Sequence, residues 1–308
     1  MGFNYKRIFK NSEKRVKLMQ ALSFVPDSIM LRLQYWIKTG RRLNLNAPER
    51  YSEKVQKYKM CYKNPIMKKC ADKYAVREYL EERGYGQYLN EIYGVYTSPQ
   101  DIDFEKLPKQ FVLKDTLGSG DDSMIIVTDK DKLDISLAKI KMSKWVNEPT
   151  HLKNPGREWV YDGVKHRIIA EKLLITDENG DLPDYKFFCF DGKVFCLYMM
   201  KNYTMHHEAG VLGFLNRDFE LLPVRRKDFA PMTVQPKKPD NYDLMVKMAE
   251  ELSKPFPHVR VDFYNISGNI IFGELTFFNA SGYVEFEPDS FDKEMGNQFN
   301  LRTYKGEW

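Results

Sequence analysis

The pattern of apolar and polar residues predicts a β-hairpin near the C-terminal end of the chain. Two runs rich in β-branched and aromatic residues, 259–264 and 270–278, flank a short polar segment at 265–269. Such runs on both sides of a turn that contains glycine, here Gly268, are typical of two antiparallel strands.

The register of this hairpin decides which polar side chains face each other. A three-residue loop at 267–269 places Asp262 opposite Glu274 and Arg260 opposite Thr276. Two carboxylates directly opposite each other repel and destabilise a sheet. A divalent cation between them would make a site instead, because Mg²⁺ takes one or two carboxylates together with phosphate oxygens. The alternative is a half-solvated hairpin with a polar outer face, and a slip of one residue would separate the carboxylates.

A helix with an apolar stripe is predicted at 29–39. Ile29, Leu33, Trp36 and Ile37 follow the spacing i, i+4, i+7, i+8, which places them on one face of a helix. We expect this face to pack on the core, and contact with a membrane surface is the alternative.

The remaining pattern mixes helices and antiparallel strands and indicates an α+β fold. Further helices are expected at 51–62, 65–83, 134–145 and 243–252. Strands are expected at 88–96, 111–114, 124–127 and 167–174, with a second hairpin across 183–200. Residues 201–240 and the tail after Pro288 show no interpretable pattern.

Composition places the chain among globular proteins. Its 308 residues are 43% hydrophobic and 30% charged, values that predict a soluble protein with a sizeable core. No apolar run approaches the roughly 18 residues of a membrane span, and the N-terminus lacks the apolar region of a signal peptide. We therefore expect a cytoplasmic location. The four cysteines show no C-x-x-C spacing, which indicates free thiols and argues against a zinc site.

The charge is unevenly distributed. Residues 1–42 contain ten Lys or Arg and two acids, a net charge of +8, so the other 266 residues carry −3. Such a basic arm either contacts an anionic membrane surface, which would place the protein at the inner face of the membrane, or forms a solvated helical face. No nucleic-acid-binding motif accompanies it, so we expect no nucleic-acid partner.

Four strings resemble the TupA-like branch of the ATP-grasp superfamily. They are DKYAVREYL at 72–80, DYKFFCFDGK at 184–193, VRVDFY at 259–264 and FGELTF at 272–277. The branch is associated with teichuronopeptide, capsule and O-antigen synthesis. The resemblance implies an ATP-grasp fold, in which two α+β subdomains clamp ATP, here with a helical N-terminal extension. The implied division is 1–50 for the basic extension, 51–105 for the N-terminal subdomain, 106–174 for the central subdomain and 175–308 for the C-terminal subdomain with the metal site.

The resemblance also implies the positions of an ATP and Mg²⁺ site. The metal ligands would be Asp262, Glu274 and Thr276, which stands where most members have Asn, and Arg260 would be the catalytic residue that stabilises charge on the transferring group. The nucleotide-binding positions would be Lys73, Lys114, Gly118, Ser119, Gly120, Glu171, Lys172, Leu173, Leu174, Asp184 and Lys186. The first two lysines would reach the phosphates, which the backbone N–H groups of the glycine-containing loop would cover. Glu171 and the main chain that follows it would read adenine, and the last two residues would hold ribose and phosphate.

The loop departs from the relatives at Asp115, Asp121 and Asp122. Three carboxylates beside a triphosphate would be repulsive unless they bind metal or point away.

The implied activity is that of an ATP-dependent carboxylate–amine ligase acting through an acyl phosphate. The association with surface polysaccharides suggests an acidic sugar or polysaccharide precursor, such as a uronic acid, as acceptor, and an amino acid or amine as nucleophile. Two alternatives remain open: an ATP-dependent sugar kinase on the same fold, and a non-catalytic module that binds nucleotide or carbohydrate.

Overall fold

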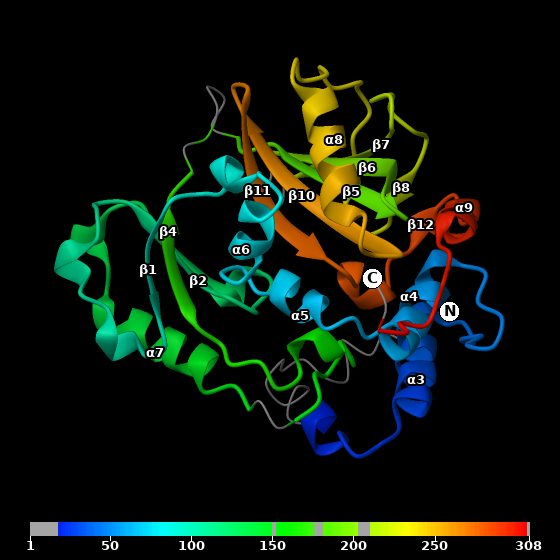
Figure 1. Ribbon diagram of the computed structural model, residues 1–308, viewed down its shortest axis with the longest axis horizontal. Coiled ribbons are helices and arrows are strands. Elements are labelled where there is room, and N and C mark those ends of the chain that lie inside the picture. The colour runs from blue at the N-terminus through cyan, green and yellow to red at the C-terminus, as the bar shows by residue number, and fades with distance from the viewer. Residues whose placement is uncertain (1–17, 150–151, 175, 177–180, 203–209, 307–308) are drawn as a thin grey trace.

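Two separate β-sheets form the framework of the protein. The computed structural model describes residues 18–149, 152–174, 176, 181–202 and 210–306. Figure 1 shows a small sheet on the left and a large sheet on the right, with helices α5 (Ile66–Ala71) and α6 (Val76–Glu81) between them. This mixture of helices and antiparallel strands confirms the predicted α+β class.

The small sheet has four antiparallel strands. Its order is β1 (Ile92–Tyr96), β4 (Ile168–Lys172), β2 (Phe111–Asp115) and β3 (Met124–Val127). One face packs on α7 (Ile135–Val146), whose first turn Asp134 caps by accepting a hydrogen bond from the Leu137 N–H. Apolar residues of the sheet and of α7 form a core of their own beneath it.

The large sheet has six strands and carries the main core. Its order is β11 (Asn269–Thr276), β10 (His258–Ile266), β5 (Asp184–Phe190), β6 (Lys193–Lys201), β7 (Val211–Asn216) and β9 (Ala230–Pro231). Helix α8 (Tyr242–Ser253) contacts β10, β5 and β6, whereas Tyr51 of α4 (Tyr51–Cys61) packs against Phe188 and Phe190 of β5 and against His258 of β10. Strand β10 is therefore buried along almost its whole length. A two-stranded ribbon of β8 (Arg225–Arg226) and β12 (Phe286–Glu287) lies beside this sheet.

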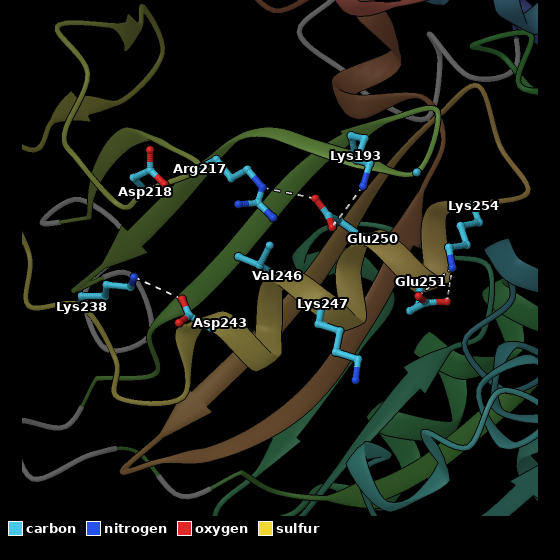
Figure 2. A pocket seen from close by; sticks show the side chains of 11 residues that line it. Lys193, Arg217, Asp218, Lys238, Asp243, Val246, Lys247, Glu250, Glu251 and Lys254 are labelled. Atoms are coloured by element: carbon cyan, nitrogen blue, oxygen red, sulfur yellow. Dashed lines mark hydrogen bonds and ion pairs between the residues drawn. The ribbon is translucent and has the colours of Figure 1, made fainter.

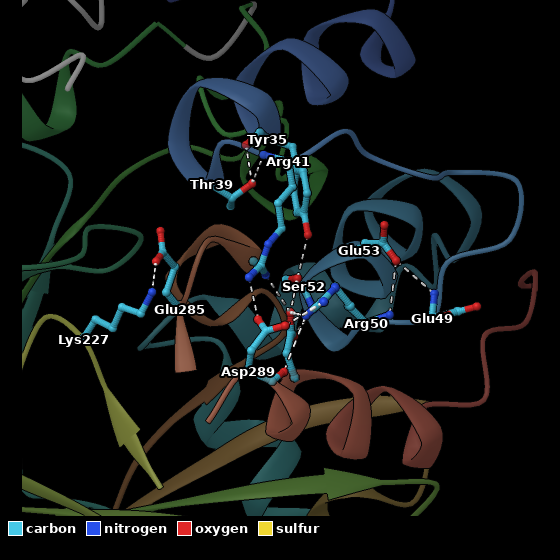
Figure 3. Close-up of polar contacts among 12 residues, drawn as sticks. Tyr35, Thr39, Arg41, Glu49, Arg50, Ser52, Glu53, Lys227, Glu285 and Asp289 are labelled. Carbon is cyan, nitrogen blue, oxygen red and sulfur yellow. Dashed lines mark hydrogen bonds and ion pairs between the residues drawn. The ribbon is translucent and has the colours of Figure 1, made fainter. Parts of the chain in front are cut away.

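The N-terminal and C-terminal helices are held together by polar contacts. Helix α3 (Asp27–Thr39) lies against α4, which packs on α9 (Ser290–Gln298). Figure 3 shows Arg41 and Arg50 converging on Asp289, at 2.5 and 2.7 Å.

Several elements differ from the sequence prediction. The helix expected at 65–83 is two helices, because Asp72 is extended and its Oδ1 accepts hydrogen bonds from the N–H groups of Tyr74 and Ala75. Local side-chain bonds of this kind compete with helix continuation. The segment 201–240 contains β7, an interior strand of the large sheet, and the tail contains α9.

The apolar face predicted for the first helix is not the face that packs. The residues of α3 that are buried are Met30, Leu31, Gln34 and Tyr35. Ile29, Leu33 and Trp36 are 58%, 46% and 51% exposed. Helical spacing identifies one apolar face, whereas the structure shows that α3 has two, one buried and one exposed.

His258 is a buried, neutral histidine at the start of β10. Its Nδ1–H donates to the carbonyl of Cys189 at 2.9 Å, so its Nε2 accepts from the hydroxyl of Tyr51 at 3.0 Å. The ring is stacked on Phe190 with centroids 4.7 Å apart. Burial lowers the pKa of His258 to about 3.

This histidine predicts a loss of stability in mild acid. The unfolded chain binds a proton at His258 below about pH 6.5, whereas the folded chain does not. The contribution of His258 to the free energy of unfolding is therefore complete above that pH and declines toward about pH 3. Between about pH 7.5 and about pH 5, the free energy of unfolding measured with urea should fall less in His258→Gln than in the original chain. The expected difference is about 2 kcal/mol. An unchanged pH dependence would show that His258 does not titrate on unfolding.

Candidate functional site

A cleft of about 630 Å³ opens between the two sheets. Both sheets contribute to its lining, as do the loops that follow β2 and β4. Of the residues predicted for a nucleotide and metal site, those that line it are Lys73, Lys114, Gly118, Ser119, Gly120, Glu171, Lys172, Leu173, Leu174, Lys186, Asp262 and Glu274. Residues more than 200 positions apart in the chain therefore meet in one hollow.

The hairpin of β10 and β11 has the expected pairing of Arg260 with Thr276, but its loop differs from the predicted one. Its loop has two residues, Ser267 and Gly268, with φ angles of 51° and 87°, which is the conformation of tight hairpin turns. The predicted three-residue loop is wrong. A β-bulge between the Val261–Leu275 and Phe263–Phe272 pairs adds one residue on β11. This extra residue compensates for the shorter loop, so Arg260 still pairs with Thr276.

The bulge depends on a glycine in β11. The bulge places Gly273 and Glu274 of β11 opposite Asp262 of β10. A Cβ atom at Gly273 would lie 3.1 Å from the carbonyl oxygen of Asp262 and 3.3 Å from its Cβ. Absence of a side chain at Gly273 lets the two strands approach closely at the site.

A guanidinium group joins the acidic residues of the hairpin. Nε and Nη2 of Arg260 donate to the two oxygens of Asp262 at 2.7 and 2.6 Å. The same Nη2 lies 2.9 Å from Oε1 of Glu274 and 3.0 Å from Oγ1 of Thr276. The expected repulsion between the carboxylates is therefore absent here, because a cation bridges them.

Arg260 is itself held firmly. The side chain is 7% exposed, and its Nη1 donates to the hydroxyl of Tyr198 and to the amide oxygen of Asn279. The amide nitrogen of Asn279 is buried and has no partner among the described residues. All three nitrogens of the guanidinium are thus engaged.

Lys186 connects the hairpin to the neighbouring strand. Its Nζ lies 2.6 Å from Oδ2 of Asp262 and 2.6 Å from Oδ2 of Asp184. Burial alone would lower the pKa of Lys186, but the two carboxylates outweigh burial and raise it. Burial raises the pKa of Asp184 to about 6, although Lys186 opposes the rise. Oδ1 of Asp184 is buried and has no partner in the described part of the chain.

Glu274 is the acid that faces the open cleft. Its side chain is 43% exposed, and it accepts a hydrogen bond from the hydroxyl of Thr276 at 2.8 Å. Burial would raise the pKa of Glu274, but Arg260, Lys186 and Lys73 outweigh it and lower the pKa to about 2. The carboxylate is therefore ionised at neutral pH.

The oxygen atoms of Asp262, Glu274 and Thr276 fit a small hard cation. One nitrogen atom, Nη2 of Arg260, lies within 3.0 Å of an oxygen of each. The described residues contain no cluster of three or more acidic, histidine or cysteine side chains that could enclose a metal. Two carboxylates and a hydroxyl leave the remaining positions to phosphate oxygens and water, which is how proteins usually bind Mg²⁺.

Two lysines and a loop form the opposite wall of the cleft. Nζ of Lys114, on β2, lies 2.6 Å from Oε2 of Glu171 on β4. Lys73 lies in the break between α5 and α6, and its Nζ donates to the carbonyl of Gly118. Burial lowers the pKa of Lys73. Gly120 has a φ of 74°, a conformation that favours glycine and that lets the loop turn over the cleft.

The extra acids of the loop are arranged away from the cleft where the structure describes them. Asp115 is buried, and both its oxygens lie 2.8 Å from Nδ1 of His166. Asp122 is exposed and does not line the cleft. The repulsion expected from these two residues is not found, and the side chain of Asp121 lies outside the described part.

The end of β4 and the residues that follow it differ in part from the adenine-binding role expected of their main chain. The N–H of Lys172 donates to the carbonyl of Glu91 at 2.9 Å, and its carbonyl accepts from the side chain of Asn90 at 2.8 Å. The main chain of Lys172 is therefore engaged within the protein. Within the described part of the chain, no hydrogen bond engages the main chain of Leu173 or Leu174.

An apolar wall of the cleft was not predicted from the sequence. Its members come from both sheets and from the segments that precede β1 and β5: Leu89, Val112, Met124, Ile126, Leu182, Ile271 and Phe272. Alternation on β3 places Met124 and Ile126 on one face, which was the available signal. Apolar walls with a few convergent polar groups are typical of small-molecule sites.

A second hollow of about 280 Å³ lies along α8. Figure 2 shows its charged side chains facing one another. Arg217 pairs with Glu250 at 3.3 Å and Lys238 with Asp243 at 3.2 Å. These charges neutralise each other at the surface, and the predicted site residues lie elsewhere.

Comparisons with known proteins relate the chain to one sequence family and to several solved structures. A family model described as TupA-like ATPgrasp matches residues 53–300. No curated protein sequence matches the chain significantly. Similar solved structures include D-alanine–D-alanine ligase from Bacillus anthracis, which is 16% identical with a TM-score of 0.40 and covers 68% of this chain and 57% of its own.

Two further structures resemble the chain to a similar degree. The ATP-grasp ligase PsnB, complexed with a variant of its minimal precursor, Mg and ADP, is 13% identical with a TM-score of 0.40, covering 78% of this chain and 62% of its own. The D-cycloserine synthetase DcsG is 14% identical with a TM-score of 0.40, covering 77% and 72%. The chain spans less than two thirds of the ligase from Bacillus anthracis and of PsnB.

Proposed function

Because this chain belongs to the TupA-like ATP-grasp family, we propose that it is an ATP-dependent carboxylate–amine ligase with its ATP site in the cleft between the two sheets. The observation that carries the proposal is the single position, now held by Nη2 of Arg260, that lies within 3.0 Å of oxygens from Asp262, Glu274 and Thr276. Asp262 and Glu274 line the same cleft as the two lysines and the glycine-containing loop.

The two sides of the cleft suit the two ends of ATP. The apolar wall suits the purine ring, and the main chain of Leu173 and Leu174, which line the same cleft, would bind the edge of that ring. Asp184, the residue expected to bind ribose, does not line the cleft, and it would act through Lys186, with which it pairs at 2.6 Å. Lys73 and Lys114 would then bind phosphate oxygens, since a mobile ammonium group pairs readily with phosphate.

Asp262, Glu274 and Thr276 would hold Mg²⁺, which when bound neutralises charge on the phosphates of the nucleotide. Glu171 holds Lys114 at the cleft wall at 2.6 Å, and so orients it toward the phosphates. The N–H groups of Arg260 that the two carboxylates now occupy are the donors that would stabilise charge on the transferring phosphoryl group.

The proposed reaction has two steps. An oxygen of the acceptor carboxylate attacks the γ-phosphorus, the bond to the β-phosphate oxygen breaks, and ADP leaves behind an acyl phosphate. The nitrogen of an amine then attacks the acyl carbon, the C–O bond to phosphate breaks, and an amide, inorganic phosphate and a proton are released. By association with the family, the acceptor would be the carboxylate of a uronic acid in a cell-surface polysaccharide precursor, and the nucleophile an amino acid or amine.

Product analysis tests this proposal. Incubation of the protein with MgATP, a panel of uronic acids and a panel of amines is expected to release ADP and phosphate in equal amounts, together with an amide detectable by mass. ADP without phosphate, together with a phosphorylated sugar, would instead identify a kinase. Nucleotide binding with no ADP formed across the panels would leave a binding module.

A further inference from the structure

Helix α3 has two apolar faces, and one of them is anchored to the protein. Leu31 and Tyr35 are fully buried and pack with Leu43 and Leu45. The hydroxyl of Tyr35 lies 2.9 Å from the hydroxyl of Ser52 on α4, a contact visible in Figure 3. The orientation of the helix on the protein is therefore fixed.

The other face carries a stripe of large exposed apolar side chains. Ile29, Leu33 and Trp36 are separated by four and three residues, so they lie on one side of the helix, opposite the buried residues. Phe24, in the turn that precedes the helix, is 81% exposed. We call these four residues the α3 stripe. Single exposed apolar residues are ordinary, but a contiguous group usually marks an interaction surface.

The described residues around the α3 stripe carry a net positive charge. Residues 18–42 contain four Lys or Arg and one acid, a net charge of +3. In the described part of this segment, Arg32 lies beside the stripe on the helix, and Arg42 is exposed just after it. A partner of the stripe must therefore offer both an apolar layer and negative charge.

We propose that the α3 stripe docks on the surface of an anionic membrane. An amphipathic helix with aromatic and aliphatic residues on one face and basic residues around it lies in the plane of the lipid headgroups. Tryptophan is enriched at that boundary, and each basic residue near an anionic leaflet contributes about 1 kcal/mol. None of the described helices has the length and apolarity needed to cross a bilayer, so the contact is peripheral.

A second copy of this chain fits the stripe less well. Pairing the stripes of two copies would bring together two described segments, residues 18–42 of each copy, that each carry a net charge of +3, and like charge opposes association. Helix α3 also lies at the edge of the molecule in Figure 1, on the opposite side of α4 from the large sheet. Docking there is independent of the activity proposed for the cleft.

Vesicle sedimentation tests the proposal. The full chain is compared with a variant that carries Phe24→Ser, Ile29→Ser, Leu33→Gln and Trp36→Gln, on vesicles of phosphatidylcholine alone and with one quarter phosphatidylglycerol. We expect binding to the anionic vesicles, reduced at least about tenfold in the variant and weakened when salt rises from about 0.1 M to about 0.5 M. The control variant Val234→Ser with Leu244→Gln, which removes exposed apolar residues away from α3, should bind as the original chain does.

Two further readouts keep the result interpretable. Because the four side chains are exposed, the melting temperature of the stripe variant should stay within a few degrees of the original. Tryptophan emission should shift to the blue on anionic vesicles, and Trp36→Phe should remove most of that shift while vesicles still bind. Equal binding by the stripe variant would overturn the proposal. So would an absence of binding to any vesicle, or a dimer that the stripe variant loses while neither protein binds lipid.

Discussion

Replacing Glu274 with glutamine is expected to reduce ATP turnover by about three orders of magnitude while leaving the fold intact. The carboxylate is ionised, faces the cleft and is 43% exposed, so its loss removes a ligand of the proposed Mg²⁺ without burying an uncompensated charge. The size follows from the several kcal/mol that a metal ion contributes to stabilising charge in the transition state. The rate of ADP release measures the effect, and Glu285→Gln, which removes a carboxylate paired with Lys227 outside the cleft, serves as the matched control.

Asp262→Asn should lose turnover as well, but at a different structural cost. Asp262 is 1% exposed and neutralises both Arg260 and Lys186. Removing one partner of a buried ion pair typically costs about 3 kcal/mol or more. A large drop in melting temperature for Asp262→Asn beside a small one for Glu274→Gln is therefore expected. Near-normal turnover in both variants would show that the hairpin is not a metal site.

Replacing Lys114 with alanine is expected to abolish the stabilisation by MgATP or MgADP. A ligand that binds only the folded state raises stability by about 2.7 kcal/mol at a hundredfold excess over its Kd, and Lys114 is proposed to supply a phosphate contact. The variant without ligand should melt slightly lower, because Glu171 is then left nearly buried without its cation. Differential scanning fluorimetry measures both quantities.

The matched control for Lys114 is Lys172→Ala. Lys172 borders the same cleft but is 53% exposed and pairs with Glu91 at 3.3 Å. Its side chain is not expected to contact the phosphates, so the shift in melting temperature should persist. A full shift retained by Lys114→Ala would remove this lysine from the nucleotide site.

Local sequence predicted the hairpin but not the feature that sets its register. Alternating β-branched and aromatic residues indicated both strands, and Arg260 does pair with Thr276. The turn is one residue shorter than predicted, and the bulge at Gly273 compensates. The bulge depends on how closely Gly273 approaches Asp262 in space, which spacing along the chain does not reveal.

Contacts between segments that are distant in the chain could likewise not be predicted from the sequence. The pairs of Lys114 with Glu171 and of Lys186 with Asp262 join residues 57 and 76 positions apart. The apolar stripe of α3 was found by its spacing, but spacing does not tell which of two apolar faces a protein buries. The strand β7 was missed because Gly213 interrupts its short apolar run, and glycine weakens a strand signal. The division of the chain at residues 50, 105 and 174 stays a prediction.

The dependence of nucleotide affinity on Mg²⁺ tests the central claim most directly. Isothermal titration of ATP into the protein, with Mg²⁺ and with excess chelator, reports binding without requiring an acceptor. The original chain is expected to bind ATP at least about tenfold more tightly with Mg²⁺, since the carboxylates of Asp262 and Glu274 otherwise lie near the phosphates without a divalent cation between them. Glu274→Gln should lose most of this difference. Equal affinity with and without Mg²⁺ in the original chain would contradict the assignment of Asp262, Glu274 and Thr276 as the metal site.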